Sequence, residues 1–115
     1  MRHWGIWVDG RLGGGLELQD RGDRRASISY IVFPAFRRQG FAAEAIRQAA
    51  SWALENMPVD AVVAIVDVEN VASRATAERG GFVLEGAAER REYDETGPSL
   101  RYVFPPSGGP LGQGR

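Results

Sequence analysis

The segment from Ile28 to Ala42 joins a strand to a helix through a short turn, and this combination restricts the possible folds more than any other part of the chain. Ile28–Phe33 is rich in β-branched and aromatic residues, which favour a strand, and Pro34 ends it. A long amphipathic segment begins directly after Gly40. A turn that leads into a helix presents unpaired backbone N–H groups and the positive end of the helix dipole. The segment therefore predicts a strand–turn–helix unit with an anion site at the start of the helix.

The residue types in this turn suit a diphosphate. Gly40 lets the backbone approach a phosphate closely, and Ala42 is small enough to leave the neighbouring space open. Arg37 and Arg38 add charged donors beside it. The alternative is a glycine-containing loop before an ordinary helix, with two solvated arginines. A P-loop is excluded because the chain contains no lysine. The other familiar phosphate-binding motif, G-x-G-x-x-G at the start of a helix, is also absent from the sequence.

Length and composition favour one globular domain and exclude several classes of function. The 115 residues are 43% hydrophobic and 25% charged, as in globular domains. The formal net charge of −1 argues against a protein that binds nucleic acid. Cysteine is absent and His3 is the only histidine, so we expect no disulfide, no Ser-His-Asp triad and no metal site. Neither a secretory signal nor a membrane-spanning stretch is recognisable, so a cytoplasmic protein without a membrane partner is expected.

Hydrophobic periodicity predicts a mixed α/β domain over residues 1–104 with the element order β-β-β-α-β-α-β-β. The expected strands are Trp4–Val8, Leu12–Leu18, Ser27–Phe33, Ala61–Val68, Phe82–Ala87 and Leu100–Phe104, and the expected helices are Phe41–Met57 and Asn70–Arg79. The strand that begins at Phe82 is expected to continue towards Tyr93. Residues 105–115 are rich in proline and glycine and predict a disordered tail.

The connections between these elements predict how the strands pair. A helix between the third and fourth strands requires these two strands to be parallel, whereas the flanking strands form antiparallel hairpins. Ala61–Val68 is almost entirely apolar, which is typical of a strand covered on both faces. The glycines at 13–15 lie between strand-like segments and indicate a hairpin or a β-bulge. Gly80 and Gly81 are placed to end the second helix with a left-handed residue.

Three motifs occur together in the order and spacing of one known family. They are Arg37-Arg-Gln-Gly-Phe-Ala42, Glu69-Asn-Val-Ala-Ser73 and Gly80-Gly-Phe-Val-Leu-Glu-Gly86. The chain resembles the GNAT N-acetyltransferases, in particular the Rim-type branch, which acetylates protein N-termini and small amines. The similarity runs from Trp4 to about Phe104. Family members usually begin with a further strand and two helices, which are missing here, and those helices form much of the wall of the acceptor site.

This resemblance implies a GNAT-like sheet that binds acetyl-CoA as a co-substrate and uses no metal. The diphosphate would lie on the backbone N–H groups of residues 38–43. The pantetheine arm would run like an extra strand between Ile28–Phe33 and Ala61–Val68, which splay apart, and an N–H near Phe33 would polarise the thioester carbonyl. The cofactor-binding residues implied are Val32, Phe33, Arg37, Arg38, Gln39, Gly40, Phe41, Ala42, Ala43, Asn70 and Ser73.

The resemblance also implies two catalytic residues. Ser73 matches a serine that donates a proton to the leaving thiolate, and Glu92 matches a glutamate that acts as the general base. The residues themselves leave other interpretations open. Asn70 and Ser73 also suit the start of a helix, where both residue types cap backbone groups, and Glu92 lies in a charged run of the kind that usually forms a solvated face.

The chain is therefore expected to move an acetyl group from acetyl-CoA to a primary amine of a protein N-terminus or a small molecule, by direct attack in a ternary complex. The alternative is a truncated, catalytically weak GNAT domain that acts as a CoA-binding or interaction module. A nucleotide-phosphate binder of another class is a more distant third. Apolar surface around Trp4, Ile6 and Trp7 is expected to bring two copies together as a homodimer.

Overall fold

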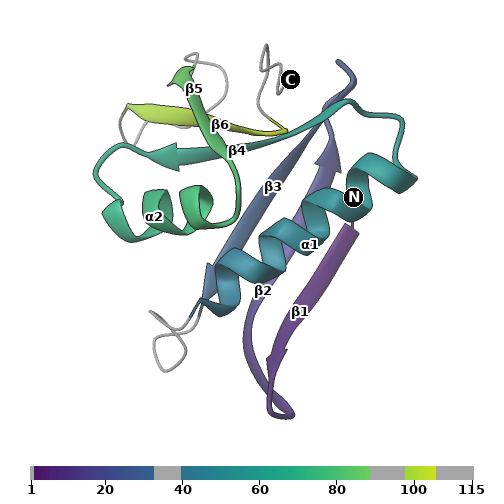
Figure 1. Cartoon of the computed structure of the whole chain (residues 1–115), viewed down its shortest axis with the longest axis vertical. Helices are drawn as coiled ribbons and strands as arrows, with labels where there is room; N and C mark the ends of the chain where they lie inside the picture. Colours follow the sequence, from purple (N-terminus) through teal and green to yellow (C-terminus); the bar gives the residue numbers. More distant parts are fainter. Residues whose placement is uncertain (1, 33–39, 89–97, 106–115) are drawn as a thin grey trace.

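Both helices lie on one face of a six-stranded mixed sheet (Figure 1). The computed structural model describes residues 2–32, 40–88 and 98–105. Its elements are β1 (Arg2–Val8), β2 (Arg11–Asp20), β3 (Arg25–Val32), α1 (Phe41–Asn56), β4 (Ala61–Asp67), α2 (Val71–Arg79), β5 (Val83–Ala87) and β6 (Ser99–Phe104). The predicted α/β class and element order are confirmed, and the end points agree with those expected to within two residues.

The order of the strands across the sheet is β1-β2-β3-β4-β6-β5. β3 and β4 are parallel and α1 crosses between them, whereas all other neighbouring pairs of described strands are antiparallel. The predicted parallel pair with flanking hairpins is therefore confirmed. The last strand, β6, lies between β4 and β5, so β1 and β5 form the two edges of the sheet.

The glycine run in β2 forms a β-bulge. Ile6 lies opposite Gly14, whereas the next residue, Trp7, lies opposite Leu12. Gly13 is therefore an extra residue without a partner in β1, as the glycines predicted. A bulge of this kind increases the local twist of the strand pair, here at the outer edge of the sheet.

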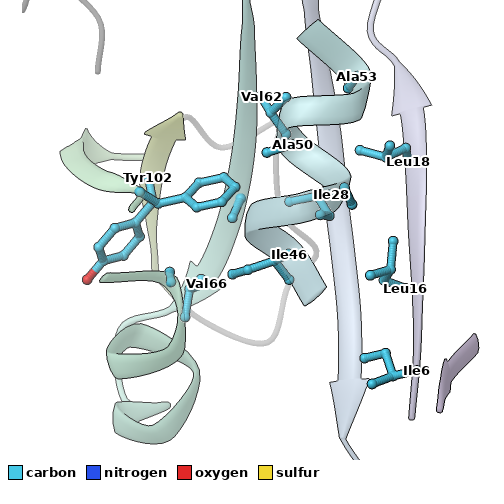
Figure 2. Packing of buried hydrophobic residues seen from close by; sticks show 14 residues of the cluster. Ile6, Leu16, Leu18, Ile28, Ile46, Ala50, Ala53, Val62, Val66 and Tyr102 are labelled. Atoms are coloured by element: carbon cyan, nitrogen blue, oxygen red, sulfur yellow. The ribbon is translucent and has the colours of Figure 1, made fainter. Parts of the chain in front are cut away.

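The main core fills the space between the helices and the sheet (Figure 2). Leu18 and Ile28 contribute from the sheet, and Ile46 and Ala50 contribute from α1. Five of the six buried residues on α1 are alanines, and side chains this small let the helix backbone lie close to the strands. The start of α1 is thereby fixed relative to the end of β3.

The opposite face of the sheet carries a smaller apolar cluster. It consists of Ala61, Val63 and Val103, with Ile65 packed against it. Val62 belongs to the main core instead, on the helix side. β4 is thus buried on both faces, which confirms the interpretation of its continuous apolar sequence.

The prediction that Ile6 contributes to an exposed apolar surface on the N-terminal strand is wrong. Strand alternation turns Ile6 towards α1, where it joins the main core with only 7% of its surface exposed. Trp4 points to the same side and meets Trp52 of α1 edge to face, with ring centroids 5.3 Å apart. Trp7 is 66% exposed, so the apolar surface of β1 is confirmed mainly at this residue.

Two consecutive glycines end α2 and let it pack against α1. Gly80 keeps a right-handed helical conformation with φ −77°, and Gly81 is the left-handed residue with φ 94°. The left-handed helix end that these glycines predicted is therefore confirmed. A Cβ on Gly80 would lie 2.8 Å from Cγ1 of Ile46 and 3.1 Å from the carbonyl oxygen of Ala43. Only a residue without a side chain lets the end of α2 approach α1 this closely.

Two expectations fall outside the described residues. These are the continuation of β5 towards Tyr93 and, except for Pro105, the tail at 105–115. Among the helices that the structure describes, none combines the length and the apolar character needed to cross a bilayer.

We predict that Gly80→Ala destabilises the fold by about 1–3 kcal/mol, the usual cost of overpacking. Ile46 is completely buried in the main core, so its side chain can move only by displacing other core residues. Chemical denaturation of both proteins measures the difference. Gly15→Ala is the matched control, because its new Cβ would meet nothing nearer than the Trp4 carbonyl oxygen at 3.5 Å. A Gly80→Ala variant as stable as the wild type would show that the two helices are not packed this tightly.

Candidate functional site

The first turn of α1 presents backbone N–H groups that the helix does not use. The first intrahelical bond of the helix runs from the N–H of Glu44 to the carbonyl of Gly40, at 3.2 Å. The N–H groups of Phe41, Ala42 and Ala43 precede this bond, and no side chain of the described residues caps the helix. Three aligned donors at the positive end of a helix dipole form the anion site that the sequence predicted at this position.

Gly40 shapes this site through its backbone. It has φ 81° and ψ −2°, a left-handed conformation that residues with a side chain rarely adopt. A Cβ built on Gly40 would meet no atom of the described residues within 4 Å, so these residues leave the space beside the N–H groups open. Ala42 is buried, which gives its small side chain a packing role as well.

One acidic residue lies in the first turn of α1, where it would oppose an anion. Neighbours along the helix hold the Glu44 carboxylate away from the anion site. It pairs with Arg47 and accepts a hydrogen bond from Nε2 of Gln48 at 2.7 Å. The hydrogen bond from Arg47, followed by that from Gln48, lowers the pKa of this exposed carboxyl. Its charge is therefore paired on the helix surface and does not occupy the anion site.

β3 and β4 are paired only at their beginning. Their ladder runs from Arg25 opposite Ala61 to Ser27 opposite Val63 and includes three pairs. From there the strands diverge towards the end of β3, which lies beside the start of α1 (Figure 1). The outer edge of β3 stays paired with β2 as far as Val32, and the outer edge of β4 stays paired with β6. Two strand edges without a shared ladder therefore face each other, as the predicted splaying requires.

The turn from β4 into α2 is built by polar side chains. Asp67 accepts a hydrogen bond from the N–H of Glu69 at 2.8 Å, and the N–H of Asn70 bonds to the Asp67 carbonyl at 3.0 Å. Oδ1 of Asn70 then accepts the N–H of Ser73 at 3.0 Å, which makes Asn70 the N-cap of α2. The capping role is therefore confirmed. It uses Oδ1, and no described residue bonds to the Nδ2 hydrogens of this exposed amide, which can therefore reach a ligand.

A tyrosine that the sequence analysis did not identify links β3 to the start of α2. Tyr30 of β3 lies with its hydroxyl 3.0 Å from Oγ of Ser73 and 3.0 Å from the Ser73 carbonyl oxygen. Burial raises the pKa of the Tyr30 phenol, so it stays protonated at neutral pH. The available signal was its position two residues after Ile28, on the face of β3 that points into the core.

The structure brings together some of the predicted site residues and not others. Gly40, Phe41, Ala42 and Ala43 form the start of α1, and Asn70 and Ser73 form the start of α2. Val32 ends β3 opposite Gly14. Phe33, Arg37, Arg38, Gln39 and Glu92 lie outside the described residues. Within the described ranges, no three acidic or histidine residues cluster in a way that would hold a metal ion.

Comparison with known proteins identifies the family. The model of the acetyltransferase (GNAT) domain matches residues 2–83. A Bacillus subtilis protein described as a putative ribosomal N-acetyltransferase, YdaF, is 35% identical over 86 residues, which are 73% of this chain. The crystal structure of a probable acetyltransferase superposes with a TM-score of 0.72 at 31% identity and covers 86% of the chain and 58% of that protein.

The fold is also that of RimL, a ribosomal L7/L12 α-N-protein acetyltransferase solved with coenzyme A. That structure has a TM-score of 0.75 at 23% identity, over 88% of this chain and 59% of RimL. The chain spans about half of the curated relatives that it matches, with 47% of the length of YdaF and 46% of the length of an uncharacterised B. subtilis N-acetyltransferase, YoaA. From the family model, the sequence identity and the shared fold together, the chain belongs to the GNAT acetyltransferases and is similar to their Rim-type branch.

Proposed function

We propose that this chain binds acetyl-CoA and transfers its acetyl group to a primary amine, on a protein N-terminus or a small molecule. The observation that carries the proposal is the start of α1, where three N–H groups that make no intrahelical bond lie beside the end of β3, on the side where β3 has diverged from β4. Membership of the GNAT family supports it. Two proteins of the same fold, RimL and the immunity acetyltransferase MccE, were solved with CoA and acetyl-CoA respectively.

The cofactor would use backbone groups for most of its contacts. Its diphosphate would accept hydrogen bonds from the N–H groups of residues 38–43, with Arg37 and Arg38 adding charge. Its pantetheine arm carries amides, and it would pair with the unshared edges of β3 and β4 in the manner of an added strand. Nδ2 of Asn70 would donate to the same arm. This arrangement directs the thioester towards the end of β3 at Val32 and Phe33.

The reaction proposed is direct attack of the amine nitrogen on the thioester carbonyl carbon. A backbone N–H near Phe33 would stabilise the oxyanion as the C–N bond forms. Glu92 would take the proton that the attacking nitrogen loses. The C–S bond then breaks, and Ser73 would donate a proton to the departing thiolate. No covalent enzyme intermediate is needed, because amine and acetyl-CoA are bound together.

A second candidate is a domain that holds CoA without efficient transfer. The chain spans 47% of the length of YdaF, so acetyl transfer by these residues needs its own test. Release of free thiol from acetyl-CoA in the presence of an amine panel separates the two candidates. We further propose a cytoplasmic site of action and self-association through β1, an edge strand on which Trp7 is 66% exposed.

We predict that CoA raises the melting temperature of the wild type and that Gly40→Leu abolishes this shift. The leucine side chain would fill the open space beside the N–H groups of Phe41–Ala43. Gly22→Leu is the matched control, since Gly22 has φ 83° against 81° for Gly40 and a Cβ there also meets no atom within 4 Å. Both variants carry similar backbone strain, and only the control should keep the CoA shift. An unchanged shift in Gly40→Leu would place the cofactor elsewhere.

Glu92→Gln is expected to lower acetyl transfer at pH 7 by roughly a hundredfold or more, the usual scale for a general base. CoA affinity should not change, because Glu92 is not placed on the cofactor. Part of the rate should return at higher pH, where more of the amine is already neutral. Steady-state rates with a responsive amine and CoA titrations measure both effects. Wild-type rates in the variant would assign the proton transfer to water or another carboxylate.

Self-association should depend on the indole of Trp7. Light scattering at micromolar concentration is expected to show a dimer for the wild type and a monomer for Trp7→Ser, because the exposed ring would be buried in the contact. Val71→Ser controls for the loss of an apolar side chain, since Val71 is 70% exposed on α2, away from the β1 edge. A monomeric wild type would exclude the dimer.

A further inference from the structure

Tyr30 provides a side-chain link between β3 and the start of α2. Its hydroxyl lies 3.0 Å from both Oγ and the carbonyl oxygen of Ser73, although the ladder between β3 and β4 ends at Ser27. The ring packs against the main core and is half-buried, which limits its movement. A rigid aromatic side chain therefore holds a small polar one at the place where the strands have separated.

The hydrogen-bonding capacity of the two hydroxyls restricts how they pair. A phenol has one hydrogen to donate, and two oxygens of Ser73 lie within its reach. If the phenol donates to the carbonyl, the Ser73 hydroxyl can donate only back to Tyr30. If the phenol donates to Oγ, the Ser73 hydrogen is free to point away from Tyr30.

We propose that Tyr30 is a positioning residue that orients the Ser73 hydroxyl as the proton donor to the thiolate of CoA. The assignment rests on the proposed function. For this role Tyr30 donates its hydrogen bond to Oγ of Ser73, and the Ser73 hydrogen points at the sulfur. When the C–S bond breaks, the electron pair stays on sulfur and the Ser73 proton moves to it, and a water molecule returns a proton to Oγ of Ser73 as the thiol leaves. The bond from Tyr30 stabilises the negative charge that develops on Oγ during this transfer.

Two properties of Tyr30 suit this role. Burial raises the pKa of the phenol, so Tyr30 remains a donor throughout the neutral range. Its hydroxyl also approaches the first turn of α2, whose N-cap is Asn70, so the helix backbone fixes Ser73 while Tyr30 fixes the direction of its hydroxyl. These contacts account for a tyrosine here better than packing does, because packing alone would be met by phenylalanine.

A double-mutant cycle tests the assignment. Tyr30→Phe is expected to lower kcat for acetyl transfer about three- to tenfold, the factor expected for one lost hydrogen bond, with little change in KM for acetyl-CoA. Ser73→Ala should lower kcat at least as much. Tyr30→Phe should then have no further effect in the Ser73→Ala background, because its target is gone. A Tyr30 hydroxyl that acted only through the Ser73 carbonyl would instead keep its effect in the Ser73→Ala background.

Tyr102→Phe is the matched control. Its hydroxyl is also hydrogen-bonded, to Oε2 of Glu78 at 3.0 Å, but Tyr102 is completely buried on β6. This variant should be less stable, with kcat within twofold of the wild type. Independent, multiplying effects of Tyr30→Phe and Ser73→Ala would overturn the assignment, and so would a Ser73→Ala variant of full activity. A wild type that shows neither acetyl transfer nor CoA binding would instead overturn the proposed function, and this assignment with it.

Discussion

The early end of the ladder between β3 and β4 is the constraint on which the rest of the structure depends. The sheet consists of two three-stranded halves, β1-β2-β3 and β4-β6-β5, that share three pairs, the last of them between Ser27 and Val63. Each half keeps its own antiparallel partners along its outer strands, so neither needs the other for its backbone hydrogen bonds beyond that point. Separating the strands therefore removes backbone hydrogen bonds only along their two inner edges.

The helices fix the geometry on either side of this divergence. α1 packs its alanine-rich face on the sheet, and its free N–H groups are thereby held beside the end of β3. α2 follows β4 through the turn capped by Asn70. Gly80 brings the end of α2 against Ile46 of α1, and Tyr30 joins β3 to the first turn of α2. Two contacts at opposite ends of α2 therefore set its position relative to the other half of the sheet.

Local sequence signals predicted the elements well because each has a local physical cause. Gly40 marked a backbone turn, and the glycine run in β2 marked a bulge. The prediction for Ile6 was wrong because a tryptophan-rich strand gives no reliable sign of which face meets a helix far along the chain. Tyr30 was missed for a related reason. Its partner, Ser73, is distant in sequence, and only the parallel crossover brings the two together.

Backbone NMR during a CoA titration tests the central claim most directly, which is that the cofactor lies at the start of α1 and between β3 and β4. The account predicts saturable shifts of the Phe41, Ala42 and Ala43 amides, together with amides at 28–32 and 64–67 along the two inner edges. The loop between β1 and β2 should not respond. Saturable shifts confined to other parts of the sheet would contradict the account, and so would the absence of any saturable shift.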